Sequence, residues 1–71
     1  MKEGDSMAVK NNLKSIRTAH RISQAELAEA VGSCSRTISR IERGDRNPSL
    51  EMALIIAGYF HVDVESIFTL D

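Results

Sequence analysis

Residues 23–44 contain two short helical patterns separated by a short linker that begins with a glycine, and this arrangement constrains the fold more than any other part of the chain. Ser23 and Glu26 have the spacing of a capping box, in which each side chain bonds the other's backbone N–H, so a helix begins there. Gly32 ends it, because glycine readily adopts the left-handed conformation that terminates helices. The second pattern covers about 35–43, with a serine or cysteine as its cap and the next glycine as its end. The sequence therefore predicts two short helices joined by a tight turn.

Further helices are expected on both sides of this pair. A first helix over 8–19 is predicted by residues at helical spacing, namely Val9, Leu13, Ile16 and His20. After Pro48, Ser49 can cap a helix from Leu50 to about Tyr59, which is apolar almost all round. Such a helix is either the centre of a small bundle or is buried further by a partner. Asp63 can cap a last turn or two, carrying Val64, Ile67 and Phe68.

The chain has 71 residues, enough for one domain with a small core, because a chain of this size buries only about 60% of its unfolded surface. Aromatic residues make up 4% of it, and good helix formers are plentiful. We therefore expect an all-α domain over 7–71, after a loose polar tail over 1–6. No strand is evident from the pattern.

Cysteine usage and hydropathy indicate the compartment. One cysteine cannot form a disulfide within the chain, and small secreted domains usually need several. No apolar run approaches the roughly 20 residues of a membrane span. A cytoplasmic protein without a membrane contact is expected.

Charge is distributed unevenly along the chain. The net charge is −1, but the segment from Lys10 to Arg46 contains eight basic and four acidic residues, which gives it a local net charge of +4. A solvated face and an anion-binding face are equally good interpretations of such a cluster until its geometry is considered.

A helical wheel decides between them. At about 100° per residue, Arg36, Arg40 and Arg43 form one stripe of the 35–43 helix, and Ile38 and Ile41 lie opposite. A helix with these two faces can hold its domain with the isoleucines and present planar, bidentate donors with the arginines.

Glu42 is the exception, because the wheel places it beside the isoleucines. Arg17 flanks the apolar stripe of the first helix and is its predicted partner, in a buried ion pair that orients one helix on the other. The alternative is that both side chains are solvated.

The segment SQAELAEAVGSCSRTISRIERG, with NNLKSIRTAHRIS before it and NPSLEMALIIA after it, resembles the helix-turn-helix of the Cro and XRE-type (phage-repressor-like) regulator family. The resemblance covers almost the whole domain. It implies a five-helix, lambda-repressor-like bundle that binds double-stranded DNA, with the second helix of the motif in the major groove. It places the family's frequent Arg–Glu pair on Arg17 and Glu42.

The resemblance also implies contact residues. The base-reading positions are Ser35, Arg36 and Arg40, with Thr37 and Ser39 at the border. The phosphate-binding positions are Ser23, Gln24, Arg43, Arg46 and Asn47. One departure lies in the turn, where Ser33 and Cys34 occupy places that often hold an apolar residue and a Ser or Thr cap.

Other functions are less well supported. Cys34 is interpreted as a small filler residue in preference to a redox switch. His20, His61 and Cys34 lack ligand-like spacing, so no metal is expected, and neither is another cofactor or a small-molecule ligand. No nucleophile–base pair stands out, and an enzyme is not expected. The rival function is a protein-interaction module such as an antitoxin, which shares the fold.

A homodimer is expected as well. The C-terminal segment holds more apolar area than a small core requires, in Tyr59, Phe60, Val62, Val64, Ile67, Phe68 and Leu70. Two recognition helices about 34 Å apart would then reach successive major grooves, and blocking a promoter, as a repressor does, is the simplest mechanism. The alternative is that these residues close the core of a monomer.

Overall fold

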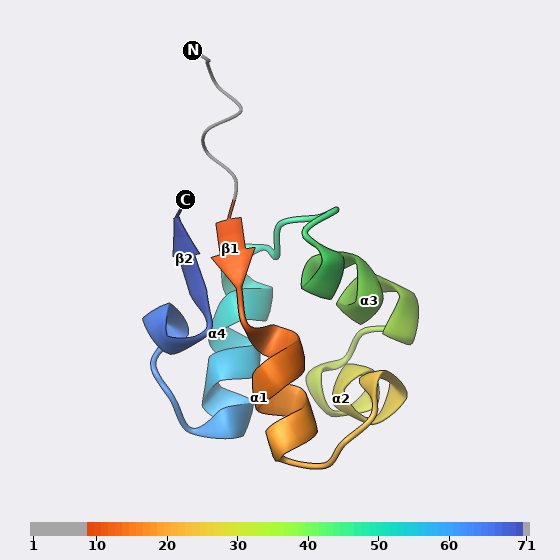
Figure 1. Cartoon of the computed structure of the whole chain (residues 1–71). Coiled ribbons are helices and arrows are strands. Elements are labelled where there is room, and N and C mark those ends of the chain that lie inside the picture. The colour runs from red at the N-terminus through yellow and green to blue at the C-terminus, as the bar shows by residue number, and fades with distance from the viewer. Residues whose placement is uncertain (1–8, 71) are drawn as a thin grey trace.

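The computed structural model describes residues 9–70, which form four α-helices, a short 3-10 helix and a two-stranded ribbon (Figure 1). In chain order the elements are β1 (Val9–Asn11), α1 (Leu13–Ala19), α2 (Gln24–Val31), α3 (Ser35–Arg43), α4 (Leu50–Phe60), η2 (Val64–Ser66) and β2 (Phe68–Leu70). The expected tail over 1–6 lies outside the described residues.

The helix-turn-helix has the predicted boundaries. Ser23 Oγ accepts from the Glu26 amide at 3.0 Å and Glu26 Oε1 accepts from the Ser23 amide at 2.7 Å, which completes the capping box of α2. Gly32 (φ 76°) and Gly44 (φ 80°) end α2 and α3 in the left-handed conformation. These two glycines therefore set where each helix stops and the next segment turns.

One core joins all four α-helices. Its buried apolar side chains are Leu13, Leu27, Ala28, Val31, Ile38, Ile41, Ala53, Ile56, Ala57, Phe60, Ile67 and Phe68. Helix α2 contacts both α3 and α4. Removing these side chains from water is the main source of stability in so small a domain.

The first helix was predicted to begin too early in the chain. Val9–Asn11 is a strand, and α1 begins only at Leu13. The chain changes conformation here because Asn11 Oδ1 accepts from the Leu13 amide at 3.0 Å, a local bond that competes with helix, and because β2 pairs with β1. Val9 is in helical phase with Leu13 but takes its place in the ribbon instead.

The predictions of a fifth α-helix and of an all-α fold are wrong for the described residues. After Asp63 the chain makes only the 3-10 turn η2, and β2 then runs antiparallel to β1, with Val9 opposite Leu70 and Asn11 opposite Phe68. The β-branched and aromatic residues at 67–69 suit a strand once a partner strand is available. In Figure 1 the ribbon lies above α1, and the C-terminal strand follows η2, which contacts α4.

Among the described residues, no helix combines the length and the apolar character needed to cross a membrane.

Candidate nucleic-acid interface

Helix α3 is divided into a docking face and an exposed face. Ile38 and Ile41 are buried in the core, whereas Arg36, Arg40 and Arg43 are exposed. In Figure 1, α3 lies at the edge of the molecule, and no other element covers its outer side in that view. The structure therefore brings the three arginines to one free surface of the helix, as the wheel requires.

The remaining predicted base-reading positions lie on or beside this surface. Ser35 is exposed at the start of α3, and Thr37 and Ser39 are half-buried. Arginines present several N–H donors on a planar group, and hydroxyls can donate or accept, so this surface can hydrogen-bond base edges.

The residues predicted to bind phosphate fall into two groups, those whose side chains already have partners in the protein and those that are exposed in or near the loop after α3. Ser23 is exposed, but its hydroxyl belongs to the capping box, and Gln24 Nε2 donates to Glu42 Oε1 at 3.0 Å. Arg46 and Asn47 are exposed in the loop after α3. Arg43 is exposed too, and its Nε lies 3.1 Å from Asp45 Oδ2 in a solvated ion pair, which is a weak interaction that a phosphate can replace.

A buried ion pair holds α3 against α1. Arg17 Nε lies 2.6 Å from Glu42 Oε2 and Arg17 Nη2 lies 3.1 Å from Glu42 Oε1, and the two side chains are only 9% and 4% exposed. Arg17 Nη1 also donates to the Ile22 carbonyl at 2.9 Å. Together with the bond from Gln24, these contacts tie α3 to α1, to α2 and to the segment between them.

The pair shifts both ionisations. The hydrogen bond to Glu42 raises the pKa of Arg17 above its ordinary value. Burial acts to raise the pKa of Glu42, but the hydrogen bonds from Arg17 and Gln24 outweigh it, so the pKa of Glu42 lies below its ordinary value. Both groups are therefore charged at neutral pH.

This shift predicts a pH dependence of stability. A carboxyl whose pKa is lower in the folded state stabilises the protein above its unfolded pKa of about 4.3, and this contribution is lost as the pH falls through the folded pKa. We expect the difference in unfolding free energy between the wild type and Glu42→Gln to be large at pH 7 and to shrink below about pH 4. Urea unfolding followed by circular dichroism at several pH values measures it. A difference that stays constant down to pH 3 would contradict the assignment.

Cys34 is the N-cap residue of α3, and it is exposed, so it does not fill a gap in the core. It makes no side-chain capping bond, and its sulfur lies 3.4 Å from Thr37 Oγ1. This hydrogen bond lowers the pKa of the Cys34 thiol below its ordinary value. Within residues 9–70, no three His, Cys, Asp or Glu side chains are grouped so that they could hold a metal ion.

The residues predicted for the dimer interface have separated into two groups. Phe60, Ile67 and Phe68 are buried inside the single chain, and Val62 and Val64 are half-buried against its core. Tyr59 and Leu70 are 42% and 67% exposed. Only these last two offer a second copy a large apolar surface.

Helix α4 exposes several apolar side chains, of which only Tyr59 was assigned to an interface from the sequence. Leu50, Leu54 and Ile55 are 76%, 54% and 40% exposed and, with the exposed Tyr59, are spread over the half of the helix that faces away from the core. The signal for this exposure was the apolar character of this helix on almost all sides, which exceeds what one small core can cover.

Comparison with known proteins agrees with this geometry. The sequence profile of the helix-turn-helix family matches residues 13–67. An uncharacterized HTH-type transcriptional regulator of Methanocaldococcus jannaschii is 43% identical over 60 residues, which cover 84% of this chain and 91% of that protein. The crystal structure of the restriction-modification controller protein C.AhdI from Aeromonas hydrophila superimposes with a TM-score of 0.71 at 33% identity, covering 76% of this chain and 78% of C.AhdI.

A more distant similarity concerns the antitoxin PezA of Streptococcus pneumoniae. It is 39% identical over 51 residues, which are 72% of this chain but only 32% of PezA. The similarity is therefore confined to about a third of that antitoxin.

Proposed function

The chain belongs to the XRE-type helix-turn-helix family of DNA-binding transcriptional regulators, and on this basis we propose that α3 enters the major groove of double-stranded DNA and reads its bases. Arg36 and Arg40 contact guanines by paired hydrogen bonds, and Ser35, Thr37 and Ser39 make the bordering contacts. The observation that carries the proposal is the exposure of Arg36 and Arg40 on the side of α3 opposite its two buried isoleucines.

Phosphates are bound on either side of α3. The exposed Arg43, Arg46 and Asn47 lie at its C-terminal end, and the first turn of α2, with Ser23 and Gln24, supplies backbone N–H groups. Because the Ser23 and Gln24 side chains already have partners in the protein, their contribution comes mainly from positioning the start of α2. Such contacts fix the register of a protein on DNA without reading its sequence.

Selection from random double-stranded DNA tests this function. The wild type is expected to enrich one family of duplexes, and its affinity for them is expected to exceed that for a scrambled duplex of equal length at the same salt. Failure to enrich any sequence would contradict specific readout.

Protection of the Cys34 thiol tests which surface is bound. Cys34 is exposed at the start of α3, so iodoacetamide should alkylate it readily in the free protein and slowly in the complex with the enriched duplex. The scrambled duplex at the same concentration is the control. Equal alkylation rates with and without the enriched duplex would contradict the placement of α3.

The regulator acts as a repressor in this proposal, because occupying a promoter is the simplest way for a DNA-bound protein to change transcription. Its cytoplasmic location, expected from the single cysteine, also stays a prediction.

Two copies pair as a two-fold homodimer through the exposed face of α4 and the end of β2. The residues are Leu50, Leu54, Ile55, Tyr59 and Leu70. Beside Leu70 the surface has an apolar hollow of about 400 Å³, lined by Val9, Phe68 and others, which can receive a side chain of the second copy. Support comes from these five large apolar side chains, each of which is at least 40% exposed.

Leu54→Glu is expected to shift the protein from dimer to monomer, because it replaces one of the exposed apolar side chains of α4 with a charge without disturbing the core. Sedimentation at several concentrations measures the mass. Ser15→Glu adds the same charge at an exposed position of α1 and should leave the dimer intact. A wild type that is monomeric at tens of micromolar would contradict the dimer.

The antitoxin-like alternative predicts a different result in the selection. A module that acts mainly on a partner protein does not need selective DNA binding, so no duplex would be enriched and Cys34 would stay reactive in every mixture.

A further inference from the structure

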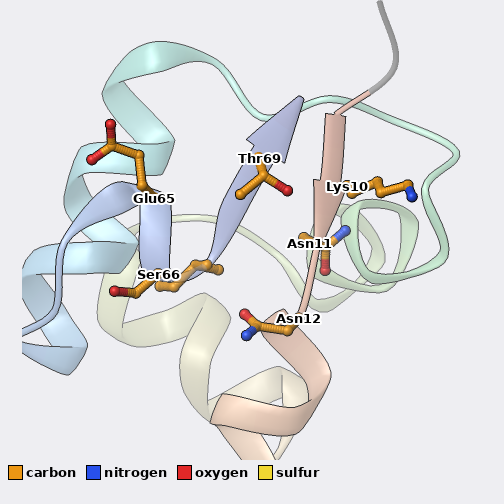
Figure 2. Close-up of a pocket in the computed structure, with 7 residues that line it drawn as sticks. Lys10, Asn11, Asn12, Glu65, Ser66 and Thr69 are labelled. Carbon is orange, nitrogen blue, oxygen red and sulfur yellow. The ribbon is translucent and has the colours of Figure 1, made fainter. Parts of the chain in front are cut away.

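The side chain of Asn11 connects the ribbon to the DNA-facing helix. Asn11 Nδ2 donates to the carbonyl of Ile41 in α3 at 2.8 Å, and Asn11 Oδ1 accepts from the Leu13 amide at the start of α1 at 3.0 Å. Asn11 is half-buried on β1, beside a hollow of about 320 Å³ between the ribbon and η2 (Figure 2). In Figure 2 its amide oxygen points toward the start of α1. One amide group thus holds both β1 to α1 and β1 to α3.

Asn11 and the ion pair act on neighbouring residues of α3. The Ile41 carbonyl is bound by Asn11, and the next side chain, Glu42, is bound by Arg17 and Gln24. Apolar contacts of Ile38 and Ile41 hold α3 on the core but are non-directional, so they permit small rotations of the helix about its axis. Hydrogen bonds have narrow ranges of distance and angle, so they restrict such rotations of the helix.

The position of Asn11 is itself well defined. Its backbone pairs with Phe68 in the ribbon, and the Asn12 amide donates to the Ile67 carbonyl at 3.0 Å. The amide of Asn11 is therefore attached to a strand whose backbone is held by its own pairing and not by α3. It can serve as a fixed reference for the helix.

We propose that Asn11 is a positioning residue for DNA recognition, whose bond to the Ile41 carbonyl sets the rotation of α3 at which Arg36 and Arg40 meet their bases. This inference rests on the proposed function of α3. Asn11 touches no DNA; it acts through the arginines, since a paired arginine–guanine contact tolerates only small displacements.

The stability cost of losing this bond is small. The Ile41 carbonyl also accepts from the Gly44 amide at 3.0 Å, so it keeps a partner when Asn11 no longer donates. In Asn11→Asp, the carboxylate can still accept from the Leu13 amide but cannot donate to Ile41 and repels its carbonyl oxygen. This variant therefore removes the orienting bond and leaves the start of α1 satisfied.

The test measures, for each variant and for the wild type, the affinity for the duplex that the wild type enriches and the affinity for a scrambled duplex of equal length, both at the same salt concentration. Asn11→Asp is expected to lower the ratio of the two affinities at least about tenfold. Using the ratio cancels the effect of the added negative charge, which weakens both complexes alike. Asn12→Ala is the matched control, because the exposed side chain of Asn12 makes no capping bond in the structure, and its ratio should equal that of the wild type.

A double-mutant comparison separates positioning from a general structural role. In the Arg40→Ala background, Asn11→Asp is expected to lower the ratio much less than it does in the wild type, because both changes affect the same contact. General destabilisation would reduce binding to both duplexes by the same factor and leave the ratio unchanged. If Asn11→Asp does not fold, Asn11→Ser, whose hydroxyl can accept from the Leu13 amide, is measured in its place.

The outcomes are distinct. A ratio within twofold of the wild type in a folded Asn11 variant overturns the positioning role and leaves the proposed function intact. A wild type that enriches no duplex overturns both. A reduced ratio that is additive both with Arg36→Ala and with Arg40→Ala also overturns the role, since Asn11 would then act independently of both arginines.

Discussion

Replacing Arg17 with Ala is expected to lower the free energy of unfolding by about 3 kcal/mol or more, because it leaves the Glu42 carboxylate buried without its main partner. The Ile22 carbonyl loses a donor in the same change. A domain of this size has a total stability of only about 5 kcal/mol, so much of the helical signal should be lost near 37 °C. Urea unfolding followed by circular dichroism measures the effect.

Two further variants define the cause. Asp45→Ala breaks the exposed pair with Arg43 and should change the free energy of unfolding by less than about 0.5 kcal/mol. The double variant Arg17→Met, Glu42→Leu replaces the buried pair with apolar groups and should recover part of the loss, because no unpaired charge remains. A loss below about 1 kcal/mol in Arg17→Ala would mean that the pair behaves as a solvated one.

Loss of Arg36 or Arg40 is expected to have the largest effect on DNA binding. Each paired contact with guanine is worth about 1–3 kcal/mol, so Arg36→Ala and Arg40→Ala should each lower the affinity for the enriched duplex about 5- to 150-fold. Affinity for a scrambled duplex should fall far less, because only the phosphate contacts contribute there. Both arginines are exposed, so the folded state should be unaffected.

Arg46→Ala is the matched control for this prediction. Arg46 is exposed in the loop after α3, at a proposed phosphate position. Its loss should weaken binding to all duplexes about equally and reduce the salt dependence of the affinity by about one charge. If Arg40→Ala leaves selectivity unchanged at the same salt, base reading by this arginine is wrong.

The boundaries of α2 and α3 could be predicted because local signals set them. Ser23 and Glu26 bond each other across one turn, and Gly32 and Gly44 adopt the left-handed conformation that the sequence suggests. The Arg17–Glu42 pair could be predicted as well, since a helical wheel shows which charged residue lies on the wrong side of an amphipathic helix.

The ribbon could not be predicted from the sequence. Each strand has three residues, which is too few for an alternating pattern. Each is extended only because it pairs with the other strand, which is far away in the sequence. The role of Asn11 depends on that pairing and was missed for the same reason. A polar Asn–Asn pair interrupting the apolar period before Leu13 was the available signal.

The division of α3 into two faces has a consequence for how such a regulator diversifies. The side chains that hold α3 in the fold, chiefly Ile38, Ile41 and Glu42, are separate from those exposed on its outer side. Exchanges at exposed positions usually change stability by no more than about 0.5 kcal/mol. A descendant of this chain can therefore acquire a new target sequence one residue at a time, even though its small core leaves little stability in reserve.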